Sequence, residues 1–276
     1  WDLDEASGNA IDVKSGYNGT LINTPTQGAA GKILSGYTFA KASLETIDIG
    51  EIAGLKLGQI SVSAWFKTTT TNNYLCIASE TNSALDHGWA ITTEWNNLRT
   101  EIGGYGYSVT LDSTSTVTNG AWWHVVFTHD GTTAKMYLNG VQEGGDQSLP
   151  VNINYSGGTK TYIGSRSSAT SQPFDGTIDE VGIWNHALTH SEVLRLYNCG
   201  SGITYNVPTI TPTLTPSPSR SVVSATPSRT PTRTPSETPD ATPSRTPTVT
   251  PSRTPSISVS GAATTPSRTP TLTVSR

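Results

Sequence analysis

Aromatic side chains are confined to residues 1–205, and this division decides which part of the chain can fold. All seven Trp, ten Tyr and four Phe lie at or before Tyr205, whereas 14 of the 17 Pro lie after residue 206. A segment with so little apolar surface cannot offset the entropy of ordering its backbone. We therefore expect one globular domain over residues 1–206 and a low-complexity tail over residues 207–276.

The tail is a Thr/Ser-Pro repeat. From Pro227 to Pro255 a proline recurs every four residues, as in "TPSRTPTRTPSETPDATPSRTPTVTPSRTPS". Proline fixes φ and biases the preceding residue to extended conformations, so the segment favours polyproline II without fixed long-range structure. This composition is typical of O-glycosylated stalks, and an unmodified linker to a further module is the alternative.

The composition of the chain argues against two classes of function. The first 206 residues carry 10 Lys and Arg against 19 Asp and Glu, while the tail carries seven Arg against two acids. An acidic domain lacks the basic face that nucleic-acid binding needs. No apolar run approaches the roughly 18 residues that a membrane helix needs, so we expect no membrane insertion.

Short alternating segments with turn residues between them dominate the domain. In "ISVSAWFK" (60–67), Val62, Ala64 and Phe66 share one face, and Ser61, Ser63 and Trp65 share the other. "AWWHVVFTHDG" and "TAKMYLNG" predict two strands joined at Asp130-Gly131, a pair that tolerates hairpin turns. Further strands are predicted at 74–79, 88–94, 98–103, 107–112, 160–165 and 176–184. One helix is predicted at 189–197, where Thr189 and Glu192 form a capping box. The fold class is therefore all-β, a two-sheet antiparallel sandwich with one short C-terminal helix.

Several of these segments resemble one family in order along the chain. "WDLDEASGNAIDVKSGYNGTL", "ISVSAWFK", "GAWWHVVFTHDGTTAKMYLNGV" and "FDGTIDEVGIWNHALTHSEVLRLY" are similar to laminin-G-like, concanavalin A-like lectin/glucanase domains, and the last also resembles pentraxins. The resemblance implies a jelly roll with one concave sheet. It also implies that Trp65, Trp122 and Trp184 fill the core, while strand alternation turns Trp123 outward.

The stretch "ETIDIGE" (45–51) has the acids of a glycosidase but not their spacing. Glucanases on this fold carry Glu-x-Asp-x-Glu, or the same motif with one extra residue before the last Glu, and alternate residues of a strand share one face. Here Glu45, Asp48 and Glu51 are three residues apart, so Asp48 points away from the other two. We expect a surface strand at this stretch and no catalytic residues. The five His show no zinc spacing, and no nucleophile elbow or phosphate-binding loop is present.

One segment combines the side chains that bind sugars. Saccharide sites offer aromatic faces to C–H surfaces and planar polar groups to hydroxyls. "DHGWAITTEWNNLRTEIGGYGYS" supplies both, with Trp95 expected at the tip of a hairpin turn and Trp89 expected either in the site or packed between the sheets. The predicted carbohydrate-binding residues are Trp89, Trp95, Asn97, Arg99, Tyr105 and Tyr107.

The resemblance also implies a structural calcium ion. Lectins of this superfamily hold calcium through backbone carbonyls and an Asp in a late strand, which here is Asp179, with Asp4 as a second ligand. The alternative is that Asp179 binds only backbone amides. Cys76 and Cys199 form either one disulfide or two buried free thiols. Asn18 and Asn154 lie in glycosylation sequons.

These observations predict a non-catalytic carbohydrate-binding or adhesion module on an extended stalk, outside the cell or on a particle surface. Its partners are predicted to be glycans or glycoproteins. The first alternative is a structural or protein-binding module, which predicts that Trp89 and Trp95 are both buried. The less favoured alternative is a glycoside hydrolase, which requires two carboxylates roughly 5 to 10 Å apart in a cleft.

Overall fold

The structure is a computed structural model that describes residues 1–56, 58–81, 87–104, 107–149, 152–157, 159–168 and 170–205. The segment predicted as a tail, 207–276, lies outside the described residues.

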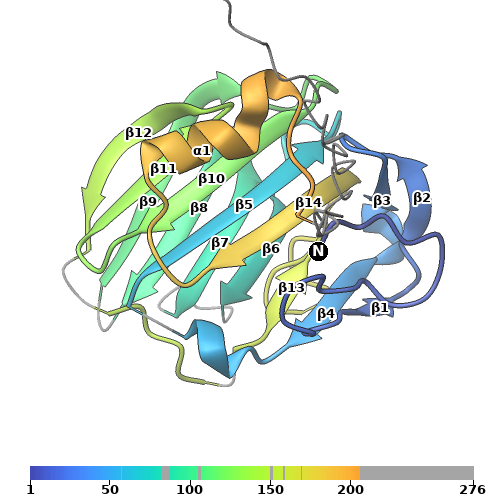
Figure 1. The fold of residues 1–276 in the computed structure, drawn as a ribbon, viewed down its shortest axis with the longest axis horizontal. Coiled ribbons are helices and arrows are strands. Elements are labelled where there is room, and N and C mark those ends of the chain that lie inside the picture. The colour runs from blue at the N-terminus through green and yellow to red at the C-terminus, as the bar shows by residue number, and fades with distance from the viewer. Residues whose placement is uncertain are drawn as a thin grey trace, which may run out of the picture. The chain divides into compact units, whose positions relative to one another are not determined.

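Two seven-stranded antiparallel sheets face each other (Figure 1). Sheet I has the strand order β1-β4-β13-β6-β7-β8-β9, and sheet II has the order β12-β11-β10-β5-β14-β3-β2. The strands of sheet I are β1 (Thr20–Ile22), β4 (Thr46–Gly50), β6 (Leu75–Thr81), β7 (Gly88–Glu94), β8 (Asn97–Gly104), β9 (Tyr107–Thr116) and β13 (Thr161–Ile163). Those of sheet II are β2 (Thr26–Ala30), β3 (Ser35–Phe39), β5 (Ile60–Lys67), β10 (Trp123–His129), β11 (Thr133–Leu138), β12 (Val141–Ser148) and β14 (Gly176–Trp184). The helices are α1 (His190–Tyr197) and the single-turn helices η1 (Lys41–Ser43), η2 (Ala53–Leu55) and η3 (Asn198–Gly200). The all-β sandwich with one short helix is confirmed.

The local signals in the sequence place the strands and turns. β5, β7 and β14 have the predicted bounds. The β10–β11 hairpin turns at Asp130 and Gly131, where Gly131 takes a φ of +98°. The Asp130 carboxylate accepts the backbone N–H groups of Thr132 and Thr133 at 2.9 and 2.8 Å, which closes the turn.

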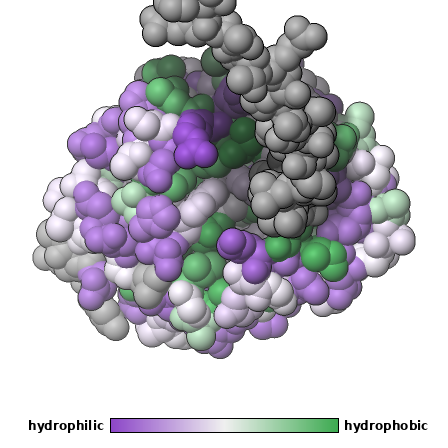
Figure 2. All heavy atoms as spheres, viewed as in Figure 1, coloured by the Kyte–Doolittle hydropathy of each residue, from purple (hydrophilic) through white to green (hydrophobic). Residues whose placement is uncertain are grey.

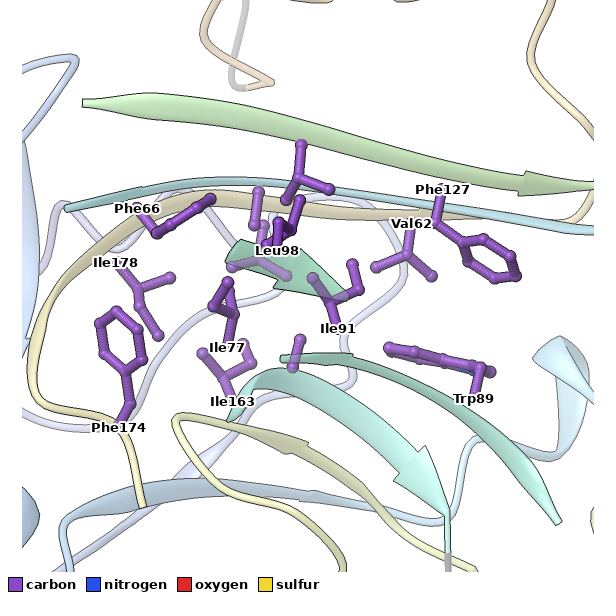
Figure 3. Packing of buried hydrophobic residues seen from close by; sticks show 14 of the residues in the cluster. Val62, Phe66, Ile77, Trp89, Ile91, Leu98, Phe127, Ile163, Phe174 and Ile178 are labelled. Atoms are coloured by element: carbon purple, nitrogen blue, oxygen red, sulfur yellow. The ribbon is translucent and has the colours of Figure 1, made fainter. Parts of the chain in front are cut away.

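The core fills the space between the two sheets (Figure 3). Val62 and Phe66 of β5 point into it from sheet II, while Ile77 and Ile91 point into it from sheet I. Each such buried side chain contributes about 1.5–3 kcal/mol relative to exposure. Val62 and Phe66 therefore share one face of β5, as the alternation predicted.

A second apolar cluster lies on the outer face of sheet II, beneath α1. Val126 of β10 and Tyr137 of β11 contact Val193 and Leu196 of the helix. The capping box at Thr189 is present, with the Thr189 side chain accepting from the Glu192 backbone and the Glu192 carboxylate accepting from the Thr189 backbone. Figure 1 shows the helix in front of β10 and β11, and Figure 2 shows the same view with hydrophilic side chains dominating the margin near β12.

Four tryptophan expectations need correction. Trp184 is half-buried against the apolar cluster on the outer face of sheet II and does not fill the core between the sheets. Trp65 is buried, but on the outer face of sheet II, where its ring stacks on Tyr197 at 5.8 Å. Trp123 packs against the main core because it pairs with the inward-facing Phe66, and Trp122 is half-buried beneath the Lys67 ammonium group.

The cysteines and the sequons were ambiguous in the sequence. Both thiols are free: Cys76 is buried in β6 and Cys199 is exposed in η3, so neither the disulfide nor a pair of buried thiols is observed. Asn18 is exposed, whereas Asn154 is buried and its side chain accepts from the Ser156 backbone.

Among the described residues, no helix has the length and apolarity to cross a membrane.

Candidate functional site

The β7–β8 hairpin presents Trp95 at its turn, as predicted. β7 and β8 form an antiparallel pair in which Gly88 lies opposite Gly103 at one end and Glu94 lies opposite Asn97 at the other. Trp95 and Asn96 therefore form a two-residue turn. Trp95 takes a φ of +59°, the left-handed region that such a turn requires. Asn96 fixes the turn, because its side-chain oxygen accepts from the Asn72 backbone at 3.0 Å and from the Thr118 hydroxyl at 3.2 Å. The Trp95 side chain is 56 % exposed.

Tyr74 lies beside Trp95 and completes an aromatic surface. The two ring centroids are 6.0 Å apart with planes inclined by 55°, and Tyr74 is 41 % exposed. The Tyr74 hydroxyl approaches Glu94 Oε1 at 3.5 Å. We call Tyr74 and Trp95 the aromatic platform. Its two adjoining ring surfaces can pack against the C–H face of a sugar or against another apolar ligand.

An arginine at the centre of an ion-pair network lies next to the platform. Arg99 donates from Nε and Nη2 to the two carboxylate oxygens of Asp112, at 2.6 and 2.8 Å. Its Nη1 forms an ion pair with Glu94, the residue that Tyr74 also approaches. The hydrogen bond to Asp112 is the main cause that raises the pKa of Arg99. Two carboxylates around one guanidinium leave a net negative charge beside the rings. The paired hydrogen bonds hold the Arg99 guanidinium in a fixed orientation.

Asn97, Arg99 and Glu101 share the outer face of sheet I because alternate residues of β8 point to the same side. Glu101 forms an ion pair with Arg166 at 2.7 Å, and both side chains are nearly buried. Burial raises the pKa of the Glu101 carboxyl, and the Arg166 guanidinium opposes this shift. Asn97 donates from Nδ2 to the Ser113 carbonyl at 3.0 Å. The outer face of sheet I is thus polar and already ordered before any ligand binds.

The structure brings together three of the six predicted binding residues and excludes one of them from the site. Trp95, Asn97 and Arg99 lie together at the β7–β8 hairpin. The assignment of Trp89 to the site is wrong, because its side chain is 1 % exposed and packs between the sheets (Figure 3). Tyr105 lies outside the described residues. Tyr107 begins β9, and its side chain is also outside the described part of the chain.

Sequence reasoning missed Tyr74, Glu94 and Asp112. Tyr74 directly precedes β6, whose Leu75 pairs with Thr93, so the strand register brings it beside the β7–β8 turn. Asp112 pairs with Arg99 across the β8–β9 ladder. A pairing of the predicted strands would have indicated both neighbours, whereas reading each strand separately does not.

The carboxylates proposed to bind calcium hold a loop in this structure. Asp179 Oδ2 accepts the backbone N–H groups of Lys32 and Ile33 at 2.7 and 2.9 Å, and Asp4 Oδ1 accepts that of Ser35 at 2.8 Å. The other Asp179 oxygen is buried without a partner, and burial raises the pKa of this carboxyl to about 7. Within the described ranges no group of three or more His, Cys, Asp or Glu residues could hold a metal ion. The arrangement does not fit a carboxylate-built calcium site, and the calcium ion stays a prediction.

The acids of "ETIDIGE" have separate structural partners. Glu45 accepts the Ala40 backbone N–H at 2.7 Å, and Asp48 pairs with Lys160 at 3.1 Å. Glu51 pairs with Lys56 at 2.5 Å. β4 is an inner strand of sheet I with Ile47 in the core, and the Glu45 side chain beside it is buried. Asp48 is half-buried and Glu51 is exposed, so the expected surface strand is confirmed only in part.

The sequence and the fold both match known proteins. A family model described as the concanavalin A-like lectin/glucanases superfamily matches residues 43–194. The binding domain of Paraclostridial Mosquitocidal Protein 1 has a similar fold, with a TM-score of 0.55 and 16 % identity over 69 % of this chain and 51 % of that one. This chain thus spans about half of that domain.

Domain 4 of AbnA, an extracellular arabinanase from Geobacillus stearothermophilus solved with arabinotriose, is also similar. Its TM-score is 0.50 at 22 % identity, over 67 % of this chain and 88 % of that one. No curated protein is detectably similar in sequence. At these identities the likeness establishes the fold, while the family match covers more than half of the chain. The chain therefore belongs to the concanavalin A-like lectin/glucanases superfamily, in its laminin-G-like branch.

Proposed function

We propose that this protein is a non-catalytic carbohydrate-binding or adhesion module that works outside the cell on an extended stalk. The observation that carries the proposal is the aromatic platform, Tyr74 and Trp95, exposed beside the ordered polar groups of Glu94 and Arg99. Saccharide recognition needs this combination of ring faces with oriented polar groups.

The geometry of the platform favours a glycan over an unspecific apolar partner. Polar and charged side chains, Glu94, Asn96 and Arg99, lie beside its two rings, and the Arg99 fork is held by two carboxylates. Carboxylate oxygens accept from sugar hydroxyls, and a guanidinium donates to them. The arabinanase domain with this fold was solved with arabinotriose, and this is consistent with a saccharide site on such a sandwich.

A glycan-array screen of the full chain, with calcium and again with a chelator, tests the proposal. Trp95→Ala is expected to lower binding at least tenfold, because the variant removes the exposed ring and leaves the turn backbone in place. Val141→Ala is the matched control, since Val141 is 65 % exposed on β12 of the other sheet.

Binding that survives Trp95→Ala unchanged would refute the platform as the binding surface. If the folded wild-type protein binds no glycan in either condition, the structural or protein-binding module becomes the better interpretation. The burial of Trp89 agrees with that alternative, whereas the exposure of Trp95 does not.

A further inference from the structure

A pocket of about 630 Å³ lies at the end of β14 in sheet II, whereas the aromatic platform belongs to sheet I. Its lining comes from the loop 12–17, from η2, from the β14 segment 181–185 and from Tyr205. Pockets of about 300–1,000 Å³ are typical of small-ligand sites. The volume therefore suits a ligand of a few rings.

Aromatic side chains form much of the pocket wall. Trp1, Tyr17, Trp184 and Tyr205 all line it. The Trp184 and Tyr205 rings meet edge to face, with centroids 5.7 Å apart and planes inclined by 74°. This edge-to-face contact holds both rings in a defined orientation.

Gly182 allows these rings to lie close to the β14 backbone. A Cβ atom at this position would come within 2.4 Å of the Trp184 ring and 3.0 Å of the Tyr205 ring. Any side chain at Gly182 would therefore displace one ring or both. The two rings can form this wall because Gly182 has no side chain.

The opposite wall is ordered by hydrogen bonds within the N-terminal segment. The Asp12 carboxylate accepts the backbone N–H groups of Lys14, Ser15 and Tyr17 at 2.9, 3.1 and 3.0 Å. Trp1 Nε1 donates to the Tyr17 carbonyl at 2.8 Å. The segment is tied to β14 because the Trp1 and Val181 backbones exchange two hydrogen bonds of 2.8 Å, and Figure 1 shows the N-terminus beside β14. The pocket is thus preformed.

Polar side chains lie at the rim of the pocket. Lys14, Ser15 and Asn185 line it and are exposed. The ammonium and hydroxyl groups donate, and the amide both donates and accepts. Ring faces inside with such groups at the rim match a sugar, which has apolar C–H faces and a belt of hydroxyls.

We propose that this pocket is a second saccharide site, which takes the terminal one or two sugar units of a glycan. The proposal shares the ligand class of the proposed function and rests on it for that class alone, since no residue is common to the two sites. The platform is an open surface on sheet I, whereas the pocket encloses its ligand at the end of β14 in sheet II.

Two variants of the full chain alter the pocket without touching the platform. Tyr17→Ala removes one ring while its backbone bonds to Asp12 and Trp1 remain. Gly54→Phe fills the pocket from η2, because a Cβ atom at Gly54 meets only the Tyr17 hydroxyl, at 3.7 Å, and the backbone there carries no positive φ. Circular dichroism and thermal unfolding serve as folding controls for both.

The same glycan array is screened with wild type, Trp95→Ala, Tyr17→Ala and Gly54→Phe. We expect a subset of glycans to bind at least tenfold more weakly to both pocket variants and to be retained by Trp95→Ala. Signals lost only in Trp95→Ala would overturn the second site and leave the platform standing. Signals lost only in the pocket variants would overturn the platform and leave the pocket as the sole site.

A synthetic peptide of the Thr-Pro-Ser-Arg repeat is the competing probe, because polyproline II segments also dock on aromatic grooves. Binding of this peptide that Gly54→Phe abolishes, with no glycan affected by the pocket variants, would assign the pocket to a polypeptide and overturn the saccharide proposal.

Discussion

Replacing Glu80 with Gln should stabilise the protein at neutral pH and flatten the pH dependence of its stability. Glu80 lies in β6, is 1 % exposed and pairs across the sheet with the buried Trp89. The Thr159 hydroxyl is its hydrogen-bond donor, at a long 3.5 Å. Burial is the main cause that raises the pKa of this carboxyl to about 7, from an unperturbed 4.5.

The sign and the magnitude of the effect follow from the raised pKa. Below about pH 4.5 the side chain is neutral in both the folded and the unfolded chain, so it contributes no penalty. Between about pH 4.5 and 7 the unfolded chain releases a proton that the folded chain retains, and stability falls by about 1.4 kcal/mol per pH unit. The penalty levels off above pH 7 at about 3 kcal/mol, and Glu80→Gln removes it.

Urea unfolding of both proteins at several pH values between 4.5 and 8 measures this difference. The free energy of unfolding of Glu80→Gln should exceed that of wild type by an amount that grows with pH. Asp146→Asn is the matched control, because the Asp146 side chain is 54 % exposed and its surface pair with Lys135 contributes little to stability. Parallel curves for wild type and Glu80→Gln across this pH range would refute the reasoning.

Three further predictions concern the ion pair, the calcium ion and the thiols. Glu101→Gln leaves the buried Arg166 guanidinium without its carboxylate, so the free energy of unfolding measured in urea should fall by about 3–5 kcal/mol. An unchanged free energy of unfolding would contradict the buried pair. Because Asp179 and Asp4 accept backbone N–H groups of the 32–35 loop, chelation should leave the unfolding temperature of wild type unchanged. A fall in that temperature on chelation that Asp179→Asn abolishes would instead show calcium bound at these carboxylates, since a ligand of the folded chain alone stabilises it. A thiol reagent should label Cys199 in the folded protein and Cys76 only after unfolding, because burial raises the pKa of the Cys76 thiol to about 12; mass spectrometry that finds both labelled in the native state would contradict this.

The sandwich was predictable because its signals are local. The alternation in β5, the Asp130-Gly131 turn and the Thr189 capping box each depend on residues within one turn or one strand of each other. These signals say which residues share a face, but not which face meets the core. In β7 both faces are buried, so the alternation could not show that Trp89 points inward.

Trp122 and Trp123 also show that the sequence does not indicate which face of a strand meets the core. The sequence places Trp122 and Trp123 on opposite faces, which is correct, but it does not say which one faces inward. Pairing with β5 decides this, because Trp123 lies opposite the core residue Phe66. The inward direction is thus a property of the sheet register, and the resemblance to a family assigned it to the wrong residue.

The two proposed sites differ in how far the sequence could reveal them. Trp95, one of the two platform residues, lies in one hairpin, where a dense run of aromatic and amide residues indicated it, whereas Tyr74 comes from another segment. The pocket joins residues 1–17, Gly54, the end of β14 and Tyr205, and no local pattern connects these. Trp184 shows the difference most clearly, because the family resemblance implied a core residue, whereas Gly182 two positions earlier leaves room for its ring in a pocket wall. If both sites bind sugars, one glycan chain or two neighbouring chains can engage opposite sheets of one domain, and the combined avidity would exceed either affinity wherever the spacing of the sugars allows both contacts at once.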